Sequence, residues 1–98
     1  MTLDDTYKIV TRFYRCDLRS ASHKPKYVRA RRAFIYLAKM RPTSDVVIGR
    51  YINRHRTLVY NQVQLIPDLI RPVNGSGYVP DKQLAEDIQK LMELMSHQ

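Results

Sequence analysis

Apolar residues recur at helical spacing over the first half of the chain. In residues 4–14 one face collects Tyr7, Val10, Phe13 and Tyr14. Residues 28–40 carry a denser apolar stripe, formed by Ala30, Ala33, Phe34, Leu37 and Ala38. The opposite face of that segment holds Arg29, Arg32, Tyr36 and Lys39. Between the two segments, the pattern predicts a short helix over 16–22 that begins weakly at Asp17, and Pro25 indicates a loop over 23–28.

The second half predicts two closely spaced helices and a final one. Thr43 or Ser44 is expected to cap a helix over 44–52, with Asp45 in its first turn. Its inward residues are expected to be Val47, Ile48 and Tyr51 or Ile52. Asn53 is expected to cap the next helix, over 54–66, which Pro67 should kink or stop. The whole pattern predicts an all-α protein, a compact bundle of about five to six helices.

A segment rich in Gly, Pro, Asn and Ser, over 71–80, predicts a linker before the last helix, 81–96. This helix is expected to begin at Pro80 or Asp81 and to turn its acids outward. Its inward residues are expected to be Leu84, Ile88, Leu91 and Met95. The end of this helix has four closely spaced apolar residues, Leu91, Met92, Leu94 and Met95, which leave a surplus of apolar surface. This surplus, with the acidic face, could form a dimer or partner surface.

The helices 44–52 and 54–66 have the spacing of a helix-turn-helix, whose second helix enters the major groove of DNA. The second helix has an inward stripe of Leu58, Val59, Val63, Leu65 and Ile66. Its outward face carries Arg56, Thr57, Tyr60, Asn61 and Gln64. Such side chains can bind base edges, and none is a carboxylate that would repel phosphate. The same spacing also fits an ordinary helix pair with a polar outer face.

Positive charge is concentrated around these helices. The chain has 17 Lys and Arg against 9 Asp and Glu, a formal net charge of +8. Residues 18–67 contain eleven of these bases and one acid, Asp45. A surface of this kind attracts polyanions through phosphate neutralisation and counterion release. Nucleic acid is therefore the favoured partner, and an anionic membrane surface is the rival, although no apolar run is long enough to span a bilayer.

Signals for enzymes, cofactors and metal sites are missing from the sequence. Cys16 is the single cysteine, and no metal-ligand spacing occurs. The three histidines are far apart, no H-E-x-x-H motif is found, and no phosphate-binding GxxxxGK[ST] loop is found. The first ten residues do not resemble a signal peptide. We therefore expect one small domain that is not an enzyme and needs no cofactor.

Three motifs in a fixed order resemble a known family. These are "VRARRAFIYLAKM" at 28–40, "VIG" at 47–49 and "NRHRTLVYNQ" at 53–62. Together they resemble the C-terminal DNA-binding domain of the bacterial replication initiator DnaA, over about residues 7–66. The resemblance implies a Trp-repressor-like helical fold with a DnaA-like helix-turn-helix domain at 1–70, a linker at 71–80 and a packing or partner helix at 81–98. It also implies a cytoplasmic, nucleoid-associated protein in a bacterial or phage-infected host.

The resemblance suggests how DNA is bound but not which sequence is bound. Where the family reads roughly Asp-His-Thr-Thr, this chain has His55, Arg56, Thr57 and Leu58. Arg29 falls where the family places an arginine that probes the minor groove. The expected DNA-binding residues are Lys24, Lys26, Arg29, Arg32, Arg54, His55, Arg56, Thr57, Tyr60 and Asn61.

Together, the helical pattern, the charge and the resemblance predict a sequence-specific double-stranded DNA-binding protein. Without the ATPase of the family, it resembles a small regulator of transcription or replication from a phage or mobile element. Two alternatives remain open. One is a phage DNA-packaging or architectural oligomer, and the other is a protein-interaction module built on a DNA-binding fold.

Overall fold

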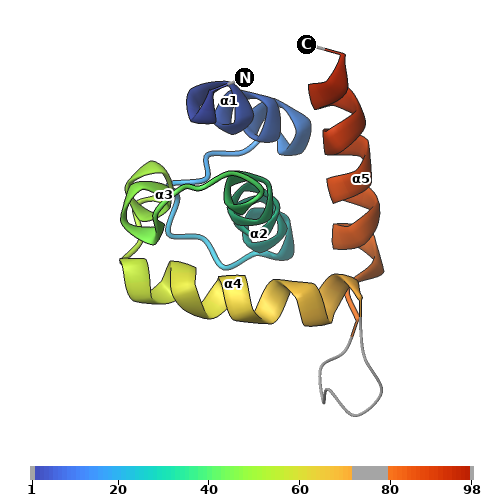
Figure 1. The fold of residues 1–98 in the computed structure, drawn as a ribbon. Coiled ribbons are helices and arrows are strands. Elements are labelled where there is room, and N and C mark those ends of the chain that lie inside the picture. Colours follow the sequence, from blue (N-terminus) through green and yellow to red (C-terminus); the bar gives the residue numbers. More distant parts are fainter. Residues whose placement is uncertain (1, 72–79, 98) are drawn as a thin grey trace.

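A computed structural model describes residues 2–71 and 80–97. These residues form five helices: α1 (Leu3–Tyr14), α2 (Pro25–Lys39), α3 (Asp45–Ile52), α4 (Arg56–Ile70) and α5 (Lys82–Ser96). The described residues contain no strand, which confirms the all-α prediction. In Figure 1, α2 is seen almost end-on at the centre, and the other four helices surround it.

The apolar stripe of α2 forms the centre of the core. All five of its predicted members are buried, as expected from their spacing. Phe34 is fully buried and lies 5.5 Å from the ring of Tyr7 on α1 and 5.7 Å from the ring of Tyr51 on α3, centroid to centroid. The central helix therefore fixes the positions of its neighbours.

The segment between α1 and α2 differs from the prediction. Residues 15–24 form turns and loop, not a short helix, because Arg15 ends α1 in the left-handed conformation (φ 54°) and the Asp17 carboxylate accepts the Arg19 amide in a local turn. Leu18 fixes this loop to the core, where it is fully buried. Pro25 was wrongly read as a loop residue. It occupies the first turn of α2, where its missing N–H costs no helical hydrogen bond.

Helix α3 begins and ends as predicted, but the residue that follows it has a different role. The Ser44 hydroxyl accepts the Val47 amide as the N-cap, and Ile48 and Ile52 are fully buried. The inward placement of Val47 was wrong, because 38% of its surface is exposed. Asn53 does not cap the following helix. It adopts the left-handed conformation (φ 56°) and terminates α3, with its amide bonded to the Gly49 carbonyl.

The connection from α3 to α4 is three residues long and closely packed. A Cβ atom at Gly49 would collide with the carbonyl oxygen of Arg54, so this position requires glycine. His55, rather than Asn53, is the N-cap of α4, and the helix begins at Arg56 rather than Arg54. Of the two effects predicted for Pro67, a kink or a stop, the stop does not occur. The helix continues to Ile70 with Leu69 buried, because one missing hydrogen bond is offset by apolar burial.

Helix α5 covers α1, α2 and α4. Its N-cap, Asp81, accepts the Leu84 amide at 3.0 Å. The inward residues are as predicted: Leu84, Ile88 and Leu91 are buried, and Met95 is partly buried. The prediction that all acids of this helix face outward was wrong for Asp87, which is 5% exposed. The Asp87 carboxylate accepts hydrogen bonds from the Tyr14 hydroxyl and the Gln83 amide, both at 2.8 Å.

The predicted linker over 71–80 lies mostly at residues 72–79, outside the described residues. Across the described ranges, no helix is both long and apolar enough to cross a membrane.

Candidate nucleic-acid interface

The first half of α4 presents a continuous polar surface. Its outward residues are all exposed: Arg56, Thr57, Tyr60, Asn61 and Gln64. From the inner side, Val59 and Ile66 hold the helix to the core with 0% and 1% exposure. Leu58, which was expected to face inward, is 38% exposed and borders this surface. The division of α4 into a core face and a solvent face is therefore as predicted, except at Leu58.

The start of α4 is built around His55. Its Nδ1 accepts the Thr57 amide at 3.1 Å and lies 3.0 Å from the Thr57 hydroxyl oxygen. With Nδ1 engaged as an acceptor, Nε2 is the ring nitrogen that can donate to an outside group. The first turn of α4 has no acidic residue, so the partial positive charge of the helix N-terminus is not neutralised locally.

Lys24 and Lys26 lie at the N-terminus of α2 rather than within a loop. Lys24 is the N-cap residue and Lys26 lies in the first turn, and both are exposed. The Lys26 Nζ lies 5.6 Å from the centroid of the Tyr27 ring. These two ammonium groups are accessible to an anionic partner.

The guanidinium groups of Arg29, Arg32 and Arg54 are bonded within the protein. The Arg29 Nε donates to both carboxylate oxygens of Asp81, at 3.2 Å each. Because the Asp81 amide donates to the Leu69 carbonyl, Arg29 lies near the C-terminal end of α4, away from its first turn. The Arg32 Nε donates to Gln62 at 2.9 Å, and Arg54 donates to the Ser20 carbonyl at 2.7 Å. The ten predicted residues therefore do not form one patch.

Arg31 was missed by the sequence reasoning and is the most buried of the basic residues, with 7% exposure. It donates to the carbonyl oxygens of Ser20 at 3.0 Å and Ser22 at 2.7 Å. Burial lowers the pKa of Arg31, and the nearby charge of Arg54 lowers it further. Its spacing could have revealed it, because position 31 lies four residues after Tyr27 and three before Phe34, within the apolar stripe.

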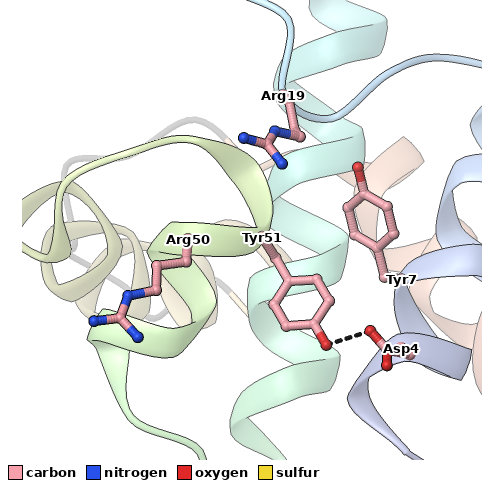
Figure 2. Close-up of a pocket in the computed structure, with 5 residues that line it drawn as sticks. All are labelled: Asp4, Tyr7, Arg19, Arg50 and Tyr51. Atoms are coloured by element: carbon pink, nitrogen blue, oxygen red, sulfur yellow. Dashed lines mark hydrogen bonds between the residues drawn. The ribbon is translucent and has the colours of Figure 1, made fainter.

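A second basic site lies between α1, α3 and the loop that follows α1. An open depression of about 350 Å³ is lined there by Asp4, Tyr7, Arg19, Arg50 and Tyr51. Figure 2 shows these five side chains. The Tyr51 hydroxyl donates to the Asp4 carboxylate, and this bond raises the pKa of Tyr51. In the described part of the chain, neither arginine side chain has a hydrogen-bond partner. Sequence reasoning did not select either arginine, because they belong to no shared periodic face.

Reactive groups are sparse in the described residues. They contain no group of three or more His, Cys, Asp or Glu arranged to hold a metal ion. Cys16 is partly buried, and burial raises the pKa of its thiol, which lowers the fraction of reactive thiolate.

Comparisons with protein-family models, with curated proteins and with solved structures found no match to this chain.

Proposed function

We propose that the chain is a sequence-specific double-stranded DNA-binding protein that acts as a small regulator of transcription or replication. The observation that carries the proposal is the outward face of α4, where five exposed hydrogen-bonding side chains follow one another without a carboxylate. This face begins at a helix N-terminus and belongs to the most basic segment of the chain. These properties suit contact with base edges between two phosphate backbones.

In this proposal α3 and α4 act as a helix-turn-helix. The three-residue connection and the close approach at Gly49 hold the two helices as one unit. Helix α4 enters the major groove by its first turns, where Arg56 and Thr57 reach deepest. Tyr60 and Asn61 follow one turn later, and the His55 imidazole lies at the entry.

The N-terminus of α2 supplies backbone contacts in the same arrangement. Lys24 and Lys26 are exposed, so they can meet phosphates without breaking an internal bond. Among the described residues Arg29 donates only through its Nε, to Asp81, so its terminal nitrogens can contact the minor groove. Arg32 and Arg54 assist from the junction between α2 and α4.

Selection of bound sequences from a random duplex pool tests the proposal directly. The wild-type protein should enrich one short site. Arg56→Ala should lose roughly 1–3 kcal/mol of binding free energy on that site and should discriminate less between bases at one position. Its melting temperature should be almost unchanged. Arg41→Ala removes the same charge from an exposed position beside the C-terminal end of α5 and should keep the site intact. No enrichment, or equal losses in both variants, would overturn the proposal.

Salt dependence separates backbone contacts from base contacts. Lys24→Ala or Lys26→Ala should weaken binding to all sequences about equally and reduce the slope of log affinity against log salt by roughly one. A change in base preference at one position would contradict this assignment.

Exposed apolar side chains favour a second candidate, a DNA-binding oligomer. Met92 and Leu94 on α5 are 41% and 48% exposed, and Met40 at the end of α2 is 57% exposed. Light scattering distinguishes the two: a regulator is expected as a monomer or dimer, and a packaging protein as a larger ring. Leu94→Lys should dissociate an assembly that uses this surface.

A further inference from the structure

A basic cavity of about 210 Å³ lies between α2, the loop before it and the beginning of α4. Four basic side chains line it: His23, Arg31, Arg32 and Arg54. The remaining lining residues are uncharged, so no carboxylate faces this space. We call it the arginine cavity.

Two guanidinium groups of the arginine cavity share one acceptor. Arg31 and Arg54 both donate to the Ser20 carbonyl oxygen, at 3.0 and 2.7 Å. Among the described residues, their other acceptors are also backbone carbonyls, those of Ser22, Ile52 and Asn53. Two neighbouring positive charges are therefore held by neutral carbonyl groups and not by a carboxylate. One of the two, Arg31, is more than nine-tenths buried. Such a pair gains from an anion, because like charges at short range disfavour each other.

The unused N–H groups of Arg32 and Arg54 indicate which kind of anion would fit the arginine cavity. A guanidinium has five N–H groups. The Arg32 side chain uses only its Nε, toward Gln62, and Arg54 leaves its Nε without an acceptor among the described residues. Planar groups of this kind bind the oxygens of phosphate in pairs. The cavity volume equals several waters of about 30 Å³ each, which is room for one phosphate group.

We infer that the arginine cavity is a phosphate-binding site, filled by inorganic phosphate or by a phosphate of a nucleic-acid backbone. The bound oxyanion joins Arg32 of α2 to Arg54 before α4 and neutralises the buried Arg31. It therefore stabilises the junction from which α4 begins. This site is separate from the outward face of α4, and its occupation by free phosphate does not depend on sequence-specific DNA binding.

Thermal unfolding in sodium phosphate, against sodium chloride at equal ionic strength, tests the site. Phosphate should raise the melting temperature in a saturable manner, beyond the effect of chloride. Arg32→Gln should raise roughly tenfold the phosphate concentration that gives half of this stabilisation, as expected for the loss of a charged hydrogen-bond donor. Arg41→Gln removes the same charge from an exposed position just after the C-terminal end of α2 and should behave as the wild type.

His23→Ala provides a second variant, because His23 is exposed and its side chain has no hydrogen-bond partner among the described residues. It should also weaken the phosphate effect, and it keeps the Arg32–Gln62 bond intact. The inference is overturned if phosphate and chloride act alike on the wild type, or if Arg41→Gln loses as much as Arg32→Gln. Such a failure would leave the proposed role of α4 untouched, since no DNA is present.

Two further probes distinguish the source of the phosphate. Dimethyl phosphate represents a backbone diester, and inorganic phosphate represents a free dianion. If the diester also stabilises the protein, and Arg32→Gln lowers the salt slope of duplex binding, the cavity takes a backbone phosphate. If only inorganic phosphate stabilises it and the duplex slope is unchanged, the cavity takes a free phosphate.

Discussion

Arg31 and Asp87 are two buried charged residues that the fold treats differently. Both are almost inaccessible, with 7% and 5% exposure, and neither has an oppositely charged partner in the described residues. Arg31 is held by the carbonyls of a loop and lies beside a second arginine and a cavity. Asp87 is held by two neutral donors, Tyr14 and Gln83, within the seam between α1 and α5.

The difference separates two uses of a buried charge. The Asp87 carboxylate has donors on both oxygens and needs nothing from outside, so it ties α5 to α1. Arg31 has backbone acceptors, but its charge is reinforced by Arg54 rather than offset. The charge of Asp87 is therefore fully satisfied in the free protein, whereas the charge of Arg31 is satisfied only when an anion binds beside it.

The largest expected effect is from Arg31→Leu. This change removes the Arg31 hydrogen bonds to the Ser20 and Ser22 carbonyls and leaves only the Arg54 bond to Ser20, so the loop is no longer tied to α2. We expect a loss of about 3 kcal/mol in the free energy of unfolding. Urea unfolding measures it through a lower midpoint at constant slope. Arg19→Leu, on the same loop but exposed, is the control and should change stability by less than about 0.5 kcal/mol. Equal losses in the two variants would remove the special role of Arg31.

Tyr14→Phe should have the next largest effect. It deletes one hydrogen bond to a buried carboxylate and keeps the ring, so about 2 kcal/mol should be lost. Tyr60→Phe removes a hydroxyl from a 56% exposed side chain and should leave stability unchanged. Urea unfolding of both variants provides the comparison, and an unaffected Tyr14→Phe protein would show that Gln83 alone satisfies Asp87.

Alkaline pH should weaken the hydrogen-bonded seam of Tyr14 and Asp87 but not the contacts of Arg31. Burial raises the pKa of Tyr14 far above its ordinary value, and the hydrogen bond to Asp87 raises it further. An unfolded tyrosine ionises near pH 10, so above that pH the unfolded state loses a proton that the folded state keeps. The contribution of Tyr14 is therefore complete below about pH 10 and declines as the pH rises beyond it.

Unfolding measured between pH 8 and 11 tests this dependence. Tyr14→Phe should decline less steeply than the wild type, whereas Arg31→Leu should decline with the wild-type slope, because guanidinium groups stay protonated in this range. Parallel curves for the wild type and Tyr14→Phe would contradict the assignment.

The smallest expected effect comes from Arg15, which links the two regions because it follows Tyr14 and begins the loop that Arg31 holds. Its left-handed backbone (φ 54°) is strained for a residue with a Cβ atom. Arg15→Gly should raise the free energy of unfolding by about 0.5–1 kcal/mol, after the greater freedom of glycine in the unfolded chain is included. Thermal unfolding is sensitive enough to detect this gain, and a lower melting temperature would indicate that the arginine side chain stabilises the loop.

Much of this fold could be predicted because its determinants are local. The apolar stripe of α2, the cap at Ser44 and the outward face of α4 each depend on residues within a few turns of one another. Asn53 was misjudged because asparagine suits both an N-cap and a left-handed C-cap. The contact between Gly49 and Arg54 decides between these roles, and the sequence pattern does not show it.

The candidate site was predictable only where it is a helix face. The exposure of Arg56, Thr57, Tyr60 and Asn61 followed from periodicity. The pairing of Arg29 with Asp81 joins residues 52 positions apart, and the bond from Arg54 to Ser20 joins residues 34 positions apart. Such pairs depend on how the helices pack, so a single sequence without structure gave no indication of them.

The Tyr14–Asp87 bond also has a kinetic consequence. It joins residues 73 positions apart, whereas the α3–α4 unit is assembled from near neighbours. Closing the longer loop costs more chain entropy, so we expect this bond to form after the transition state for folding. Tyr14→Phe should then accelerate unfolding and leave the refolding rate almost unchanged in stopped-flow experiments. The seam between the first and last helices would thus determine the lifetime of the folded protein rather than the speed at which it folds.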